Sequence, residues 1–178
     1  VRLMFNFEWS NESLFFGLYA RVNSFWQNSD LEAKGAPSQG ELAILQPLVD
    51  EGLLPASMLT NDVVMAPPSA TSQRSLDRSN LRRASALLDE AGWVAGDDGM
   101  RRKDGQTLDA SFLQASPAFD RIVNPMVENL KRLGVNASLN RVDYAQYVER
   151  SRSGDFDLIN HTMTQGFEPG TSMRQWFA

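Results

Sequence analysis

Helical hydrophobic patterns recur in the second half of the chain. An apolar stripe that begins at Ser79 and stops at Gly92 predicts one helix. A second helix is predicted to begin at Ser116, with apolar residues on one face as far as Leu133. Pro125 lies inside this second segment and predicts a kink, because proline removes one internal hydrogen bond.

Alternating apolar residues between and after these helices predict strands at 107–113, 135–139 and 156–163. A capping box of Asp143 and Gln146 opens a short helix between the last two strands, and Gly154 ends it. Strand, helix, strand, helix and strand at these spacings imply right-handed crossovers and a partly parallel sheet. Ligands gather outside the carboxyl ends of the strands in such sheets, so the segment 164–169 is the predicted site.

Two Asp-Gly turns precede the first of these strands. Asp98-Gly99 and Asp104-Gly105 separate short extended segments and predict a small β-meander that leads into the sheet. No alternating oxygen ligands continue from these residues to a closing glutamate, so the turns do not match a calcium-binding loop.

Residues 1–26 are rich in aromatic side chains. Ser10 is predicted to cap a helix that ends near Gly17. We expect the aromatic rings, Phe25 and Trp26 included, to pack in a core, since large rings usually serve packing. The alternative is that some of these rings line a ligand cleft.

The segment from 28 to 79 has one clear helical signal. Residues 28–40 are polar, and Ser38 with Glu41 forms a capping box that predicts the start of a helix. Residues 53–79 show little periodicity and contain several prolines, so we expect packed coil there.

Composition excludes several classes of protein. The chain has 178 residues, no cysteine and a net charge of −5. Without cysteine there is no disulfide framework, thiolate metal site or cysteine nucleophile. The acidic balance gives little support to a nucleic-acid-binding surface, so nucleic acid is not expected as a partner.

The residues that could carry chemistry have simpler interpretations. His161, the single histidine, lacks a second histidine or a cysteine to complete a metal site, so we expect a structural role and no metal or cofactor. The carboxylate pairs Asp97-Asp98 and Asp155/Asp157 are expected to be solvated, as is the arginine-rich face around Arg82 and Arg83. Hydrolase and nucleotide-binding motifs are missing, which favours binding over catalysis.

Neither a membrane span nor a signal peptide is evident in the chain. It opens at Val1 in an apolar pattern and closes on Trp176-Phe177-Ala178, and natural termini are usually more polar. We therefore expect a fragment of a larger protein, soluble as given.

Four sequence blocks resemble the peptide-class (family 5) solute-binding proteins of ABC importers, and their YejA-like subgroup in particular. They keep the family's order over nearly the whole chain: VRLMFNFEW (1–9) with LFFGLY (14–19) and SF (24–25), LRRASALLDEAGW (81–93), NLKRLGV (129–135) and GDFD (154–157). The resemblance implies an α/β chain forming one lobe, the second, of a two-lobe periplasmic-binding-protein (type II) fold, with a mixed sheet, flanking helices and a small β-meander. Residues 1–178 would be that lobe, with the remainder of the protein outside the chain.

The resemblance also implies a function. The protein would be a periplasmic, monomeric binding component from a Gram-negative bacterium that closes on a peptide or peptide-like ligand and delivers it to a membrane permease. The expected ligand-binding residues follow the GDFD strand: Thr164, Gln165, Gly166, Phe167 and Glu168. Oligopeptide-binding relatives hold a ligand's free amine with an acidic residue where this chain has Gln165, and a neutral amide cannot neutralise an ammonium group. We therefore expect a preference for ligands whose amine is blocked or absent.

Two other functions compete with transport. The same fold can serve a ligand-sensing receptor or interaction module, since fold alone does not separate the two, and a hydrolase is the least favoured alternative. Nickel or haem occurs as a ligand in the wider family, but one histidine and no cysteine make a metal ligand a weak candidate here.

Overall fold

The computed structural model describes residues 1–70, 73–162, 170–171 and 173–174. The chain divides into two compact units. Unit 1 comprises Val1–Tyr19 and Pro68–Thr162, and unit 2 comprises Ala20–Pro67 and Met163–Ala178. Each unit is described separately.

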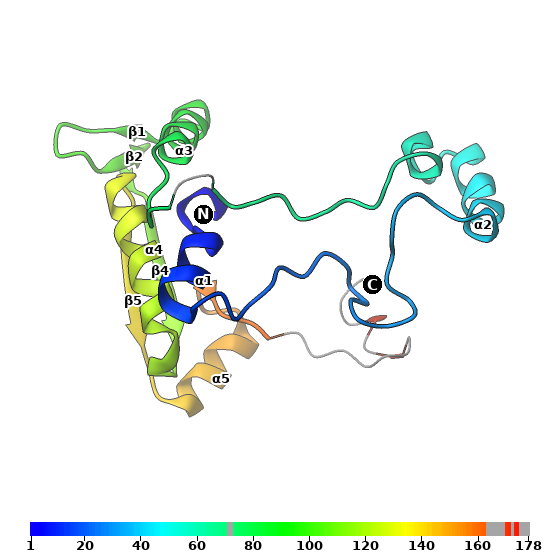
Figure 1. The fold of residues 1–178 in the computed structure, drawn as a ribbon. Helices are drawn as coiled ribbons and strands as arrows, with labels where there is room; N and C mark the ends of the chain where they lie inside the picture. Colours follow the sequence, from blue (N-terminus) through cyan, green and yellow to red (C-terminus); the bar gives the residue numbers. More distant parts are fainter. Residues whose placement is uncertain (71–72, 163–169, 172, 175–178) are drawn as a thin grey trace. The chain divides into compact units, whose positions relative to one another are not determined.

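A parallel sheet of three strands organises unit 1. Its order is β5 (Asn136–Arg141), β4 (Asp109–Gln114) and β6 (Leu158–Ile159), and β4 pairs in parallel with both neighbours. The helix α4 (Asp120–Arg132) connects β4 to β5, and α5 (Tyr144–Ser153) connects β5 to β6 (Figure 1). The predicted order of helices and parallel strands is therefore confirmed.

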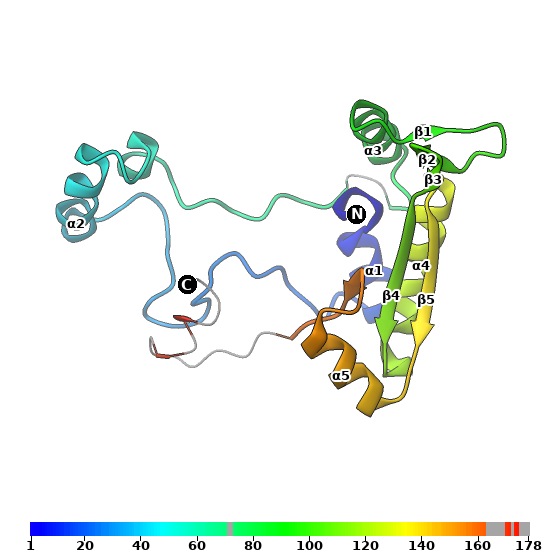
Figure 2. The same ribbon diagram turned by 180° about the vertical axis from the view of Figure 1, so that it is seen from behind.

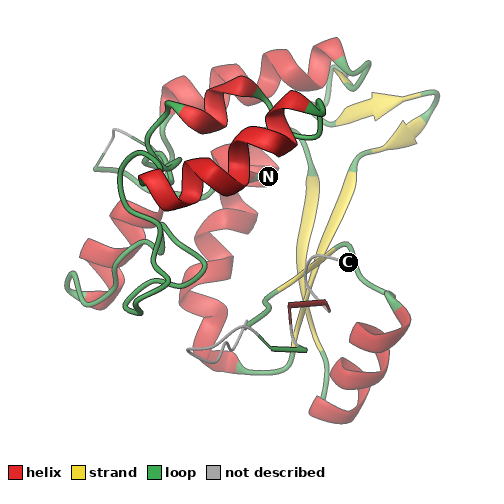
Figure 3. Ribbon diagram, turned by 90° about the vertical axis from the view of Figure 1, so that its right-hand side faces the viewer, coloured by secondary structure: helices red, strands yellow, loops and turns green. Residues whose placement is uncertain are grey.

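The strand β5 lies on one side of β4, and β6 lies on the other. The connection from β4 to β5 and the connection from β5 to β6 therefore run in opposite directions across the sheet. Right-handed crossovers then require α4 and α5 to cover opposite faces. Figure 3, in which the strands are seen nearly edge-on, shows α4 on one side of them and α5 on the other. The carboxyl ends of all three strands meet at one edge, and β4 and β5 point the same way in Figure 2.

The β-meander forms a separate antiparallel sheet. It consists of β1 (Val94–Ala95), β2 (Arg101–Lys103) and β3 (Gln106–Thr107), joined by the two predicted Asp-Gly turns. Gly99 and Gly105 have positive φ angles of 79° and 80°, a region that glycine adopts without steric cost. The segment predicted as one strand at 107–113 is thus divided between β3 and β4, which belong to different sheets.

Helix boundaries depart from the sequence prediction at two places. The helix α3 (Arg78–Glu90) begins at Arg78, because the buried Asp77 carboxylate accepts hydrogen bonds from the N–H groups of Ser79 and Asn80. Ser116 does act as a cap, but the turn it opens is a 3-10 helix (Pro117–Phe119) that leads into α4.

The helix α4 contains Pro125, and the kink expected there stays a prediction. One further element differs from prediction. The strand β6 covers Leu158–Ile159 only, so it is shorter than the predicted 156–163, and His161 lies beyond its end. The capping residue Asp143 and the stop at Gly154 are confirmed for α5.

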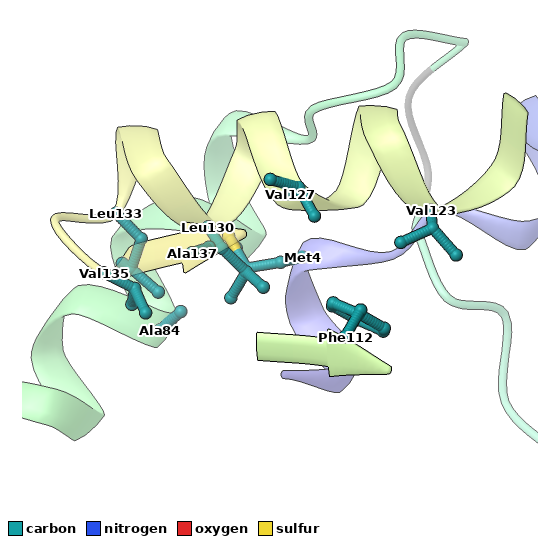
Figure 4. Close-up of a cluster of buried hydrophobic side chains, with 9 residues drawn as sticks. All are labelled: Met4, Ala84, Phe112, Val123, Val127, Leu130, Leu133, Val135 and Ala137. Atoms are coloured by element: carbon teal, nitrogen blue, oxygen red, sulfur yellow. The ribbon is translucent and has the colours of Figure 1, made fainter. Parts of the chain in front are cut away.

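The core of unit 1 lies where α4, α3 and the 3-10 helix η1 (Arg2–Met4) pack against the sheet. Met4 is only 1% exposed and lies among aliphatic side chains of these elements (Figure 4). The buried cluster comprises Met4, Ala84, Phe112, Val123, Val127, Leu130, Leu133, Val135 and Ala137. Burial of aliphatic side chains is therefore the main force that holds the unit together.

A buried arginine joins the meander to the ends of α3 and α4. Arg101 is 3% exposed, and its guanidinium donates hydrogen bonds to the Leu133 carbonyl, the Trp93 carbonyl, the Asp89 carboxylate and the Ser85 hydroxyl. Because these acceptors come from separate segments, Arg101 fixes their mutual arrangement. No sequence pattern predicted a role for Arg101.

The amino-terminal helix begins earlier than predicted. The helix α1 (Phe7–Phe15) is capped by Asn6, whose side chain accepts a hydrogen bond from the Trp9 N–H at 3.0 Å. The predicted cap, Ser10, is instead a buried residue within the helix. The helix ends at Phe16, which has a left-handed φ of 54°.

The prediction that the aromatic residues of 1–26 belong to the core is wrong for the described structure. None of these eight rings is buried, and Phe16 and Tyr19 are 86% and 57% exposed. Phe25 and Trp26 are half-buried and contact each other edge-to-face in unit 2, with ring centroids 5.3 Å apart. The core instead uses Met4, Phe112 and aliphatic residues, and four of the rings of residues 1–26 contribute to the site described below.

Unit 2 contains the predicted capped helix. The helix α2 (Gln39–Asp50) follows Ser38, and the reciprocal Ser38–Glu41 capping box is present. A 3-10 turn, η2 (Ala56–Leu59), interrupts the expected coil, and the Val63 N–H bonds to the Gly35 carbonyl at 2.9 Å. No described residue of unit 2 is buried.

Candidate ligand-binding site

The carboxyl edge of the parallel sheet gathers polar residues from three elements of unit 1. Gln114 ends β4 and is buried. Arg141 ends β5 and forms an ion pair with Asp120 at the start of α4. Beyond β6, the Asn160 carbonyl accepts a hydrogen bond from the Tyr147 hydroxyl at 2.8 Å. Topology thus places side chains of different elements at the edge where open α/β sheets bind ligands.

An aromatic hollow lies where the chain leaves this edge after β4. Its volume is about 500 Å³, which falls within the roughly 300–1,000 Å³ of small-molecule sites. The helix α1 and its flanks supply one side, and the segment from β4 into α4 supplies the other. The residues of this aromatic hollow are Phe5, Phe7, Ser10, Asn11, Phe15, Tyr19, Ala118, Phe119, Arg121 and Ile122.

Hydrogen bonds hold the aromatic rings of the hollow in place. The Asn11 side chain donates to the Tyr19 carbonyl at 2.6 Å and accepts from the Tyr19 N–H at 2.9 Å. Tyr19 therefore folds back beside α1, and its ring meets the Phe15 ring edge-to-face at 4.9 Å. Both polar groups of the Asn11 side chain have partners, so Asn11 organises the hollow and is less available to a ligand.

The hollow carries one positive charge. The Arg121 guanidinium lies 4.5 Å from the centroid of the Phe15 ring, a cation–π arrangement that holds it beside the apolar surface. Arg121 is exposed and forms no ion pair with any described carboxylate. The hollow thus combines a large apolar surface with an unpaired cation.

A second unusual group lies at the sheet edge. Gln114 is 2% exposed, and its Nε2 has no hydrogen-bond partner among the described residues. Strand alternation directs Gln114 to the same face as Phe112, the face that α4 covers. A buried amide donor without an acceptor is costly, and in native proteins it commonly marks a functional position.

The site predicted from the sequence follows the strand β6. Thr164, Gln165, Gly166, Phe167 and Glu168 lie outside the described residues. The last described residues before them, Asn160 to Thr162, continue from the carboxyl edge. Their participation in ligand binding stays a prediction.

No sequence pattern marked Gln114, Phe119 or Arg121 as site residues. Phe119 and Ile122 were assigned to the core face of a helix, and Arg121 is one of fourteen arginines, so composition gives it no distinction. The available signal was the aromatic richness of residues 1–26, for which a ligand cleft was the alternative interpretation. That alternative agrees with the positions of Phe5, Phe7, Phe15 and Tyr19.

The other residues considered for chemistry are exposed and do not line the hollow. Asp157 accepts a hydrogen bond from the Ser111 N–H, Asp155 pairs with Arg150, and both carboxylates are exposed as predicted. Arg78, Arg82 and Arg83 are exposed on α3, as expected of a solvated helix face. His161 is exposed, and the described part of the chain holds no group of three or more His, Cys, Asp or Glu that could bind a metal ion.

One carboxyl group with a strongly lowered pKa, that of Asp98, lies in the meander and does not line the hollow. A hydrogen bond from Arg102, together with one from the Met100 N–H, holds the pKa of Asp98 well below its usual range. Such a pair in an exposed turn indicates a local structural role.

None of the helices in the described residues has the length and apolar character needed to cross a membrane.

The fold is that of the type II periplasmic binding proteins. NikA from Brucella suis, solved in complex with Fe(III)-EDTA, matches 94% of this chain and 27% of its own with a TM-score of 0.60 at 20% identity. A periplasmic oligopeptide-binding protein from Thermotoga maritima, solved with mannohexaose bound, matches 94% of this chain and 27% of its own with a TM-score of 0.53 at 20% identity. The predicted fold class is confirmed, and parallel and antiparallel pairing lie in separate sheets.

The model of the bacterial extracellular solute-binding proteins, family 5 middle, matches residues 1–178. The chain belongs to this family. It is similar to the "probable peptide-binding protein YejA" of Agrobacterium fabrum, with 35% identity over 177 residues that cover 97% of the chain and 28% of the relative. It is also similar to the peptidoglycan-binding protein YepA of that organism, with 32% identity over 173 residues, 96% of the chain and 27% of the relative. The chain thus spans about a quarter of the length of these relatives.

Proposed function

We propose that the full-length protein is the extracytoplasmic solute-binding component of an ABC importer. It binds a peptide or peptide-like compound in a cleft between two lobes and delivers that compound to a membrane permease. Residues 1–178 form the second lobe, and Thr164 to Glu168 contribute to the cleft. The protein acts as a periplasmic monomer and does not catalyse a reaction on its ligand.

The observation that carries this proposal is the aromatic hollow beside the carboxyl edge of the parallel sheet. Ligand sites are concave and mostly apolar, with a few placed polar groups, and the hollow has this composition. Membership of a solute-binding family supports binding over catalysis. The name of the Agrobacterium YejA relative supports peptides, and that of YepA adds peptidoglycan as a candidate ligand.

The first experiment identifies the ligand. Native mass spectrometry of the full-length protein, purified from the periplasm without refolding, should reveal copurifying peptides. Deleting the permease genes should abolish uptake of an identified peptide while leaving its binding intact. Uptake that continues without the permease would contradict the importer role, and turnover of the peptide by the pure protein would favour a hydrolase.

The second experiment tests the two-lobe arrangement. One lobe alone leaves a bound ligand largely exposed to water, so residues 1–178 should bind the identified peptide far more weakly than the full-length protein does. Isothermal titration calorimetry on both proteins measures the difference. Equal affinities would show that this chain holds the complete site.

A third experiment tests the predicted loop. Wild-type protein should prefer an N-acetylated peptide to its free-amine form, and Gln165→Asp should shift the preference towards the free amine, because only a carboxylate neutralises an ammonium group. An unchanged preference in the variant would remove Gln165 from amine recognition.

A further inference from the structure

The aromatic hollow differs from a simple gap in the packing because it pairs apolar walls with an unpaired cation. We propose that it binds the carboxyl-terminal residue of a peptide, with the apolar side chain against the aromatic rings and the free α-carboxylate on Arg121. This inference rests on the proposed peptide-binding function and specifies the chemistry of its ligand.

The walls of the hollow determine the side chain that it accepts. Phe5, Phe7, Phe15, Phe119 and Ile122 present apolar surface. Phe119 is 40% exposed, so part of this surface contacts solvent in the absence of a ligand. Transfer of an aromatic or branched aliphatic side chain onto such a surface is favourable in proportion to the apolar area removed from water.

The charge of Arg121 determines the polar group of the ligand. The planar guanidinium suits a carboxylate because it donates two parallel hydrogen bonds. Stacking on Phe15 orients the guanidinium but leaves its N–H groups free to donate. No described carboxylate of the chain pairs with Arg121, so a ligand carboxylate meets no competitor there.

The position of Arg121 in its helix supports the same assignment. It is the second residue of α4, where the helix dipole disfavours a cation and favours an anion. A ligand carboxylate beside Arg121 would interact favourably with both the guanidinium and the helix terminus. The cation is therefore at an unfavourable place for the stability of the helix and at a favourable place for binding an anion.

The test uses the full-length protein and the peptide Ac-Ala-Ala-Ala-Phe, as its free acid and as its carboxyl-terminal amide. N-acetylation of both forms removes any contribution from amine recognition. Wild-type protein should bind the acid about 10- to 100-fold more tightly than the amide, because a hydrogen-bonded charge pair is lost in the amide. Arg121→Gln should lower affinity for the acid much more than affinity for the amide, so that the preference for the acid is lost.

A matched control lies on the same helix. Arg132 is an exposed arginine in the last turn of α4 and does not line the hollow, so Arg132→Gln should preserve the preference for the acid. Arg121→Lys keeps the charge and should retain part of the preference for the acid. This variant tests the role of the charge even if Arg121→Gln folds poorly. Phe15→Leu should narrow the discrimination between carboxyl-terminal Phe and carboxyl-terminal Ala.

The outcomes separate this inference from the function on which it rests. If neither form of the peptide binds, nor any peptide that copurifies, the peptide-binding function itself fails. If peptides bind but the acid and the amide bind equally, only the role of Arg121 is overturned. If Arg121→Gln and Phe15→Leu lower the melting temperature and leave peptide binding unchanged, another part of the full-length protein occupies the hollow.

Discussion

Unit 1 and unit 2 differ in how much apolar surface they bury. Among the described residues, every buried hydrophobic residue, from Met4 to Ala137, belongs to unit 1. In unit 2, α2 has a formed capping box and an apolar side, yet Ile44 is 69% exposed and no described residue is buried. Local signals therefore suffice to define a helix, whereas tertiary burial is needed to stabilise it.

The difference between the units predicts their responses to the same kind of substitution. Leu130→Ala in the core should lower the free energy of unfolding by about 2–5 kcal/mol, since it removes methyl groups and leaves a cavity. Ile44→Ala should change it by less than about 0.5 kcal/mol, as exposed substitutions do. Hydrogen exchange of amides in α4 and α2 of the full-length protein measures both effects. A loss at Ile44 as large as that at Leu130 would show that α2 is buried against a part of the protein outside the described residues.

The sequence predicted most of unit 1 because its signals are local. Asp143 and Ser116 cap their turns, Gly92, Gly134 and Gly154 follow helices, and the Asp-Gly pairs form turns, as each residue's own chemistry requires. The short β6, the separation of β3 from β4 and the exposure of the aromatic rings depend on which segments pair in space. Periodicity carries no information on that pairing, so these features were missed.

The sequence predicted the region of the site, at the carboxyl edge of the sheet, but not the residues of the hollow. The expectation that ligands gather at the carboxyl edge follows from strand order, and the hollow adjoins that edge. Arg121 and Phe15 are distant in sequence, and only the contact between α1 and α4 joins them. No spacing rule could have paired them.

A second prediction concerns the hydrogen-bond network around Arg101, the buried arginine of unit 1. Arg101→Met should lower the free energy of unfolding by about 2–3 kcal/mol, because a side chain of similar length leaves the Leu133 and Trp93 carbonyls without their charged donor. Urea unfolding of the full-length protein, with exchange followed at amides of α3 and α4, checks the size of the loss. Arg102→Met, in the same strand but half-buried, is the control and should cost less. Equal losses would show that the buried network adds nothing specific.

A third substitution should act in the opposite direction. Gln114→Met removes a buried amide whose Nε2 has no described partner, so it should raise the free energy of unfolding by about 1 kcal/mol. Thermal unfolding of wild type and variant gives the sign of the change. A clear loss of stability would show that the amide is satisfied in the full-length protein, by water or by residues outside those described here.

The smallest expected effect is in the meander of unit 1, where an exposed ion pair tests whether local order needs burial. Hydrogen bonds from Arg102 and from the Met100 N–H lower the pKa of Asp98, so its ionised form is favoured in the folded state. A depressed pKa stabilises the fold above the unfolded value of about 3.9, and this contribution is lost as the pH falls below that value.

Stability should therefore not change on account of Asp98 between pH 7 and about pH 5, and should begin to fall near pH 4. Because the pair is exposed, the loss should be small and reduced further by salt. Carboxyl-detected NMR should find Asp98 still ionised at about pH 3, where an unperturbed aspartate is mostly protonated. In Arg102→Gln the pKa of Asp98 should move towards its ordinary value without reaching it, since the Met100 N–H still donates. An Asp98 that titrates near its ordinary value in the wild type would mean that the Asp98–Arg102 pair does not hold the turn.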